Sequence, residues 1–297
     1  MTVIGIFGPS ASGKSAVAET IAERTPADLV SADAMQAYRG LPILTNQSAY
    51  PTRLVGVWEL DHEASVGEYA PLAHAAIDEI LASGRTPVVV GGTGLYLRAA
   101  LADLSLPPPP EPGARERSAR LYDETGAAAA HARLAEVDPA AAAAVHPNDR
   151  RRVVRALELA EAGASLAPAR DRLWAEETRR PTLLVGLDVP KDVLERRIAE
   201  RTHAMFDAGV QEEVRRALAA PISTTARKTM GIDEVATLPR TEAIEALDVR
   251  TRRYAAYQRK WMRRVPGLVM VAADRQPEET AAEIVALARI RERLPRP

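Results

Sequence analysis

Residues 2–24 read TVIGIFGPSASGKSAVAETIAER, and this stretch decides the fold. The apolar run at 2–7 predicts a buried strand, and the segment at 16–24 predicts the helix that follows it. Between them, residues 8–15 match the pattern G-x-x-x-x-G-K-[ST] in full. Glycines at this spacing allow a tight backbone path, so that successive N–H groups and the helix N-terminus point at one anion. The stretch therefore predicts a strand, a phosphate-binding loop and a helix.

Two side chains of this loop carry groups suited to a phosphate ligand. Lys14 provides a point charge for the outer phosphate, and the hydroxyl of Ser15 can ligate Mg²⁺. The alternative is a chance match in a glycine-rich turn, and the predicted strand and helix argue against it. The loop alone does not select a reaction, because kinases, nucleotide hydrolases and diphosphate-using transferases all need such a cradle.

Strands and helices continue to alternate over the first hundred residues. Three further strands are predicted there, at 29–31, 54–60 and 87–90. Ser65 and Glu68 have the spacing of a capping box, and the apolar periodicity after them predicts a helix up to Gly84. Such alternation is typical of an α/β fold, here a P-loop NTPase-like core with a parallel sheet and helices on both faces.

The middle of the chain differs in composition from both ends. Four prolines at 107–110 interrupt the alternation, and the sequence from Ala114 to about Arg180 is helical, alanine-rich and without a convincing strand. We therefore predict a core domain made of 1–111 and 181–297, with an inserted all-helical domain at 112–180.

The last third of the chain returns to the core. A strand is predicted at 182–188, and Pro190 is expected at the first position of a helix that reaches about Gly209. The remaining predicted elements are a long basic helix at 240–264, a short strand at 268–271 and a helix at 276–293.

Composition excludes several classes of chemistry. The chain has no cysteine, which excludes disulfides, thiol catalysis and cysteine-ligated metal centres and fits the cytoplasm, the location that we expect. The first apolar run is too short for a signal peptide or a membrane span, so no membrane partner is expected. The formal net charge of −1 gives no global sign of a nucleic-acid partner.

Basic residues are nevertheless concentrated in two segments. Residues 250–264 hold seven basic side chains and no acid, and residues 150–155 hold four more. This clustering indicates a localised polyanion site. On the later helix Tyr254, Tyr257 and Trp261 share one stripe, which we expect to pack on the core rather than to stack on bases. The basic residues then face outward, where phosphate contact is favoured over a merely solvated face.

Two polar residues follow predicted strands of the sheet. Asp33 comes just after the strand at 29–31, and Thr93 belongs to the GGTG that ends the strand at 87–90. Ligands bind at the carboxyl edge of such sheets, beside the phosphate loop. The alternatives are a helix cap or a bridge to Arg39 for Asp33, and a turn hydroxyl for Thr93. An ATP hydrolase would more often have an Asp at the end of the later strand, so the threonine argues against ATP hydrolysis.

Five segments together carry a resemblance to a known family: GPSASGKS at 8–15, SADAMQAYRGL at 31–41, GGTGLY at 91–96, HPNDRRRVVRALEL at 146–159 and TRRYAAYQRKWMRR at 251–264. In order and approximate spacing they resemble the tRNA dimethylallyltransferases, also called tRNA isopentenyltransferases or IPP transferases. The resemblance extends from residue 3 to about residue 275. The chain departs from the family pattern at 42–48, at 57–58 and at Ile232.

The resemblance implies an enzyme that transfers a dimethylallyl group from dimethylallyl diphosphate to the exocyclic N6 amine of the adenosine 3′ of the anticodon in tRNA, with release of diphosphate. It implies Mg²⁺ as cofactor, the tRNA anticodon stem-loop as partner, and a monomer. The chemistry agrees, because a preformed anion cradle stabilises a leaving diphosphate and a carboxylate can accept the proton of the attacking amine.

The resemblance also implies roles for individual residues. Asp33 would be the general base, and Lys14 and Thr93 would be the other catalytic groups, with Ser15 on the metal. The diphosphate would be held by Gly8, Pro9, Ser10, Ala11, Ser12, Gly13, Lys14 and Ser15, and by Lys228 from a later loop. The tRNA would be contacted by Asp33, Ala34, Met35, Gln36, Thr93, Arg115, Arg151, Arg152, Arg155 and, from the basic helix, Arg259 and Arg263.

Two other functions remain open at this point. A small-molecule kinase would share the phosphate loop and the early aspartate, but it would explain neither the helical insertion nor the acid-free basic helix. A catalytically weak RNA-binding relative would explain the departures from the family pattern.

Overall fold

The computed structural model describes residues 1–104, 106, 113–167, 173 and 175–293. The proline run at 107–110 and the predicted boundary at 112 lie outside these described residues. The chain forms two compact units, one of Met1–Asp103 with Leu173–Pro297 and one of Leu104–Arg172.

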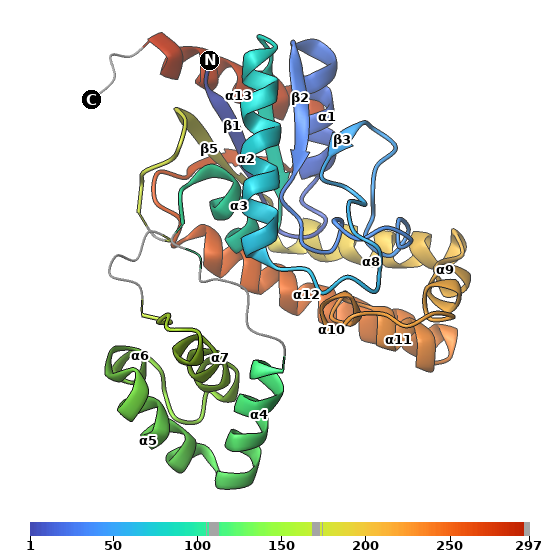
Figure 1. The fold of residues 1–297 in the computed structure, drawn as a ribbon. Coiled ribbons are helices and arrows are strands. Elements are labelled where there is room, and N and C mark those ends of the chain that lie inside the picture. Colours follow the sequence, from blue (N-terminus) through green and yellow to red (C-terminus); the bar gives the residue numbers. More distant parts are fainter. Residues whose placement is uncertain (105, 107–112, 168–172, 174, 294–297) are drawn as a thin grey trace. The chain divides into compact units, whose positions relative to one another are not determined.

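The first unit is built on a six-stranded sheet with the order β3-β2-β4-β1-β5-β6, in which every pairing is parallel (Figure 1). Its strands are β1 (Val3–Phe7), β2 (Ala27–Ser31), β3 (Thr52–Arg53), β4 (Thr86–Gly91), β5 (Thr182–Asp188) and β6 (Val269–Ala272). The predicted parallel α/β fold is therefore confirmed.

The central strand β1 is buried on both faces, which explains why its sequence is a continuous apolar run. Ile4 and Ile6 face the core formed with α1 (Lys14–Arg24) and α13 (Pro277–Arg293). Gly5 points to the opposite face, where a Cβ would lie 3.0 Å from Leu101 of α3 (Gly94–Leu101). Helix α2 (Val66–Ala82) packs beside α3, so the sheet is covered on both faces (Figure 1).

The capping box predicted at the start of α2 is present. Ser65 Oγ accepts a hydrogen bond from the Glu68 backbone N–H at 3.2 Å, and Glu68 Oε2 accepts one from the Ser65 backbone N–H at 3.0 Å. Two of the N–H groups that a helix start leaves unpaired are thereby satisfied by neighbouring side chains.

Two local predictions were wrong. Residues 54–60 do not form a strand, because Leu54 and Gly56 take left-handed backbone conformations, with φ of 65° and 60°, that end β3 at Arg53. Trp58 forms only an isolated bridge with Tyr38. Pro190 is the N-cap of α8 (Lys191–Asp207) rather than its first helical residue, because its ψ of 145° is extended.

Three short helices lie between α8 and the long helix, and the sequence did not indicate them. They are α9 (Val210–Ala217), α10 (Thr224–Arg227) and α11 (Ile232–Thr237), and they precede α12 (Arg240–Met262). Glu213 of α9 is buried and accepts hydrogen bonds from the backbone N–H groups of Ile43 at 2.8 Å and Leu44 at 2.7 Å. A buried carboxylate therefore fixes the backbone about ten residues after Asp33.

The second unit is helical, and its described residues form no strand. Its helices are α4 (Ala114–Thr125), α5 (Ala127–Val137), α6 (Pro139–Ala144) and α7 (Arg150–Glu161). They enclose a small core that includes Leu134 and Val153. Asp138 and Asp149 cap α6 and α7, each accepting a hydrogen bond from a backbone N–H three residues later.

The chain that returns from this unit is fastened to α3 by Arg98. Its guanidinium is 1% exposed and donates to the carbonyl oxygens of Leu173 at 3.0 Å and Ala175 at 2.7 Å. The backbone N–H of Arg179 donates to Leu101 O at 2.8 Å, and the side chain of Arg179 pairs with Asp78 at 3.1 Å. Burial lowers the pKa of Arg98.

We expect Arg98→Met to lower the free energy of unfolding by about 2 to 4 kcal/mol, because it leaves partly buried carbonyls without their charged donor. Arg98→Lys should cost less, since it keeps the cation. Urea unfolding followed by tryptophan fluorescence measures the change, with the exposed Arg289→Met in α13 as control. An unchanged midpoint in Arg98→Met would show that these contacts add no stability.

Candidate active site

Three neighbouring strands bring the predicted catalytic residues to one edge of the sheet. The carboxyl ends of β1, β4 and β2 lead into the phosphate loop, the GGTG turn and Asp33. Thr93 Oγ1 accepts a hydrogen bond from the backbone N–H of Ala34 at 3.4 Å, which joins the second and third of these segments. Figure 1 shows α8 and α12 lying across this edge of the sheet.

A cavity of about 450 Å³ opens beside the phosphate loop. Three cationic side chains line it: Lys14 from the loop, and Arg197 and Arg201 from α8. The rest of the lining consists of Ala11, Gly13, Ser15, Ala16, Asn46, Glu200 and Ala204. Backbone N–H groups of a glycine-rich loop, a helix N-terminus and three cations together form a site for a multiply charged anion.

The charges in this site are mutually dependent. Burial lowers the pKa of Lys14 to about 8, the carboxylate of Asp33 opposes the shift, and Arg201 adds to it. Burial also lowers the pKa of Arg201, again against the attraction of Asp33. Two buried cations repel each other here, so a bound anion stabilises their charged forms.

The phosphate loop is fastened from behind by a side chain of α12. Gln258 is 2% exposed, and its Oε1 accepts a hydrogen bond from the backbone N–H of Ser10 at 2.8 Å. Its Nε2 donates to Gly92 O at 2.8 Å. A Cβ at Gly92 would lie 2.3 Å from that nitrogen, and one at Gly94 would lie 2.3 Å from the Trp261 ring. The GGTG turn therefore needs glycines because α12 packs directly on it.

One buried hydroxyl of the loop lacks a partner. Ser12 is 1% exposed, and its Oγ makes no hydrogen bond with any described residue. Buried hydroxyls are normally paired, so this group is one place where the loop is incomplete by itself.

Phenol groups surround the other side of Asp33. Burial raises the pKa of Tyr254 to about 12, Asp33 adds to the rise, and a hydrogen bond with Thr93 opposes it. Burial, with smaller contributions from Asp33, also raises the pKa values of Tyr69 and Tyr96, whose ring centroids are 4.5 Å apart. These phenols stay neutral; Tyr69 and Tyr96 are buried, and the Tyr69 hydroxyl donates to Ser31 O at 2.8 Å.

Asp33 itself is half-buried, and its Oδ1 accepts a hydrogen bond from the backbone N–H of Met35 at 3.0 Å. This turn fixes the carboxylate. The alternative bridge to Arg39 is wrong, because Arg39 pairs with Glu59 and donates to Gly56 O at 3.0 Å.

Hydrogen bonds of the Gln36 side chain hold the segment that follows Asp33. Gln36, predicted to contact tRNA, accepts a hydrogen bond from Ser31 Oγ at 3.1 Å and donates to Thr45 O at 3.2 Å. Ala34 and Met35 are partly exposed beside it. The side chain of Gln36 therefore shapes the loop.

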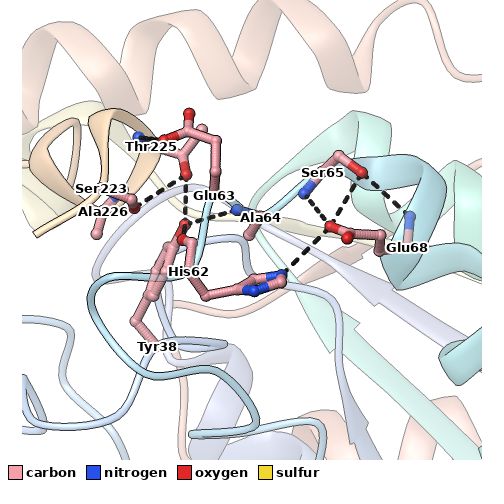
Figure 2. A network of polar contacts seen from close by, with 9 residues as sticks. All are labelled: Tyr38, His62, Glu63, Ala64, Ser65, Glu68, Ser223, Thr225 and Ala226. Carbon is pink, nitrogen blue, oxygen red and sulfur yellow. Dashed lines mark hydrogen bonds and ion pairs between the residues drawn. The ribbon is translucent and has the colours of Figure 1, made fainter. Parts of the chain in front are cut away.

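Figure 2 shows how the neighbouring segment is held. Tyr38 Oη and Thr225 Oγ1 are 2.6 Å apart, and Ala64 N donates to the same phenol oxygen at 3.3 Å. His62 Nε2 lies 3.4 Å from Glu68 Oε2, the carboxylate of the capping box. Trp58, at a departure from the family pattern, stacks on His62 with 5.5 Å between ring centroids.

The structure places the predicted diphosphate residue Lys228 away from the cavity lining. Lys228 is exposed at the C-cap of α10, whereas Arg197 and Arg201 supply the positive charge that lines the cavity. The sequence analysis missed both arginines. Their spacing of four residues on one predicted helix was a usable signal, but acidic residues on the same helix obscured it.

The arginines predicted to contact tRNA fall into two groups. Arg115, Arg151 and Arg152 are exposed on the helical unit. Arg155 pairs there with the buried carboxylate of Glu158 at 2.6 Å.

On α12, Arg263 is exposed, while Arg259 donates to Val189 O at 3.2 Å and lies 3.7 Å from Asp188. An acidic residue outside the acid-free segment 250–264 thus neutralises part of the basic face of α12. Arg252 likewise pairs with Asp248 at 2.8 Å.

The expectation that the aromatic stripe of this helix packs on the core was wrong for Tyr257, which is 55% exposed. Because α12 crosses the edge of the sheet, a different stripe faces inward. It consists of Ala243, Leu247, Thr251, Ala255, Gln258 and Met262.

The described residues contain no group of three or more His, Cys, Asp or Glu side chains able to hold a metal by themselves. The side-chain oxygen donors in the cavity lining are Ser15, Asn46 and Glu200, which are hard ligands of the kind that Mg²⁺ prefers. Within the described part of the chain, no helix combines the length and hydropathy needed to cross a bilayer.

The fold and site thus define a phosphate-loop α/β protein with an anion cavity beside the loop and with Asp33 and Thr93 at the same edge of the sheet. A sequence model of the family described as IPP transferase matches residues 36–265. A tRNA dimethylallyltransferase of Anaeromyxobacter dehalogenans (strain 2CP-C) is 40% identical over 297 residues, covering 96% of this chain and 99% of the relative. One of Thermobifida fusca is 39% identical, covering 89% and 88%.

Solved structures agree with the sequence relatives. The tRNA isopentenylpyrophosphate transferase of Bacillus halodurans superposes with a TM-score of 0.70 and 29% identity, covering 98% of this chain and 96% of that one. A eukaryotic dimethylallyltransferase acting on tRNA shares the fold, with a TM-score of 0.80 at 22% identity over 100% of this chain and 81% of that one. The chain belongs to the IPP transferase family, whose members include the tRNA dimethylallyltransferases.

The pKa of Lys14 predicts how anion binding depends on pH. With that pKa lowered to about 8, the free ammonium loses its proton as the pH rises through this value. Pyrophosphate should therefore bind more weakly at about pH 9 than at about pH 7, and the decline should be smaller in Lys14→Arg, which stays charged. Calorimetric titration measures both profiles, and parallel declines would remove Lys14 as their cause.

Gln258→Leu should weaken pyrophosphate binding and lower the free energy of unfolding by about 1 to 3 kcal/mol, because Ser10 N–H and Gly92 C=O lose their common partner. The exposed Gln211→Leu in α9 is the matched control. Equal pyrophosphate affinity in the two variants would mean that the loop keeps its shape without the amide.

Proposed function

We propose that this chain transfers a dimethylallyl group from dimethylallyl diphosphate to the N6 amine of the adenosine 3′ of the anticodon in tRNA, releasing diphosphate. One observation carries the proposal. The phosphate loop, Thr93 and Asp33 come together at the carboxyl edge of the sheet, where Thr93 Oγ1 accepts a hydrogen bond from the backbone N–H of Ala34 at 3.4 Å. The carboxylate of Asp33 also acts on Lys14 and Arg201 in the anion cavity. A proton acceptor thus stands between a site for a leaving diphosphate and a pocket for a nucleobase.

The anion cavity supports the first half of this reaction. When the allylic C–O bond breaks, negative charge develops on the diphosphate, and positive charge spreads over the allyl group. Preorganised N–H donors of the loop, together with Lys14 and Arg201, stabilise that charge where it develops. Arg197, in the same lining, extends the positive surface.

Asp33 supports the second half. As the N6 lone pair forms the new C–N bond, the amine must give up a proton. Oδ1 of Asp33 is occupied by the Met35 N–H, which fixes the carboxylate and leaves Oδ2 to accept that proton. The proton then resides on Asp33, and the diphosphate leaves with the electron pair of the broken bond.

The nucleobase reaches this position only outside the base stack, because an adenine amine inside a stacked loop is not accessible. Thr93 and Tyr254 carry hydroxyl groups at the site, and the buried rings of Tyr69 and Tyr96 pack behind it. Hydroxyl and ring together suit a flat base that carries polar edges.

Ser15 is the residue that would hold Mg²⁺ together with diphosphate oxygens, and the ion would neutralise part of the leaving group's charge. Because the cavity lining provides few protein ligands for a metal, this ion would arrive with the diphosphate.

We also assign the helical unit a role in tRNA binding, with the exposed Arg115, Arg151 and Arg152 along the RNA. The compact units divide after Asp103 and before Leu173, eight residues ahead of the predicted boundaries at 111 and 181. A monomer in the cytoplasm remains our expectation. Lys14, Asp33 and the complete phosphate loop favour an active transferase over a weak RNA-binding relative, and the family favours it over a kinase.

Asp33→Asn should reduce single-turnover prenylation of an anticodon stem-loop by about 10² to 10⁴, since the amide keeps the shape but loses the base. Both substrates should still bind. The exposed Asp274→Asn is the matched control. Full activity in Asp33→Asn would remove this carboxylate from the mechanism, and no product from the wild-type chain would overturn the proposed function itself.

A further inference from the structure

One large aromatic side chain of α12 lies on the surface next to the site. Tyr257 is 55% exposed, and its ring lies over that of Tyr254 with 6.4 Å between centroids and 23° between planes. The two tyrosines are three residues apart and therefore adjacent on one side of the helix.

The inner ring of this pair belongs to the site already described. Tyr254 lies on α12 between residues that contact the GGTG turn and the core, since Gln258 of the same helix donates to Gly92 O at 2.8 Å and Trp261 packs on Gly94. Burial and the carboxylate of Asp33 raise the pKa of Tyr254. The pair therefore leads from the pocket proposed for the target adenine to the surface beside it.

Cations flank the outer ring on the same helix. Arg253 is four residues before Tyr257 and Lys260 is three residues after it, so both lie beside the ring. Both are exposed, and neither makes an ion pair or side-chain hydrogen bond with any described residue. Proteins that bind single-stranded nucleic acids combine exposed aromatic rings with nearby cations. The bases stack on the rings, and the cations neutralise the phosphates.

The proposed reaction creates a need for such a ring. Extruding the target adenine takes a base out of the stack and leaves its neighbour without a stacking partner. An aromatic ring beside the site can stack on this neighbouring base in place of the extruded adenine. Base–aromatic stacking is worth about 1 to 3 kcal/mol.

We propose that Tyr257 stacks on the nucleobase adjacent to the extruded adenosine, with Arg253 and Lys260 contacting the phosphates on either side. The inference rests on the proposed function and deepens it, since it makes Tyr257 a residue that selects and holds the RNA. A nucleic acid fits this surface better than an apolar protein partner, because the exposed ring is bordered by charge.

A double-mutant cycle on protein and RNA tests the proposal. Affinity is measured for anticodon stem-loops that are complete, or abasic at the nucleotide on the 5′ or the 3′ side of the target adenosine. Tyr257→Leu should weaken binding of the complete stem-loop by about 10-fold. One abasic stem-loop should bind wild type and Tyr257→Leu alike, because the stacked pair is already broken.

Three further measurements make the result specific. Tyr257→Phe should retain the wild-type affinity, since stacking needs the ring and not the hydroxyl. Val249→Ala, at a 47% exposed position on the same helix, should leave binding unchanged. Pyrophosphate affinity should be the same in Tyr257→Leu and wild type, which shows that the anion cavity is intact.

The outcomes separate this inference from the function beneath it. If Tyr257→Leu binds the complete stem-loop as tightly as wild type, or if neither abasic stem-loop shows coupling, Tyr257 does not stack on the RNA. If the wild-type chain still prenylates the complete stem-loop, such a result rejects only the stacking role of Tyr257. The proposed function is then not contradicted. A wild-type chain that forms no product contradicts the proposed function, whatever Tyr257 does.

Discussion

The hydrogen bonds of the Gln258 side chain hold together parts of the chain that are far apart in sequence. A buried amide can bind one donor and one acceptor at once, and here it joins Ser10 in the first phosphate-binding turn to Gly92 after β4. Because the amide comes from α12, the same helix that carries Tyr254 is thereby set against the loop and the GGTG turn. The position of α12 against these two segments thus depends on a contact between distant parts of the chain, which no local propensity provides.

The sequence was informative wherever a feature is encoded by neighbours along the chain. The strand, phosphate loop and helix at 2–24 and the capping box at Ser65 each depend on a few adjacent residues, and both are present. Asp33 and Thr93 could be expected at one edge because parallel strands end together. Their catalytic roles, like those assigned to the tRNA-contacting arginines, stay predictions.

The features that sequence reasoning missed depend on tertiary packing. Gln258 lies 248 residues from Ser10, and no local pattern connects them. Arg201 faces the cavity only because α8 crosses the sheet edge, and Lys228 lies elsewhere for the same kind of reason. The stripe of α12 that is buried includes Thr251 and Gln258, so hydrophobic periodicity alone pointed to the wrong face.

The attachment of the helical unit has a consequence for how such enzymes can vary. The outgoing chain leaves just after α3, and the returning chain is tied back to α3 by Arg98 and to Asp103 by Arg179 at 3.2 Å. Both ends of the insertion thus meet at one helix whose other end bears Thr93. A segment anchored at a closed base can gain or lose length without shifting the strands, so the size of the helical unit is independent of the geometry at the carboxyl edge of the sheet.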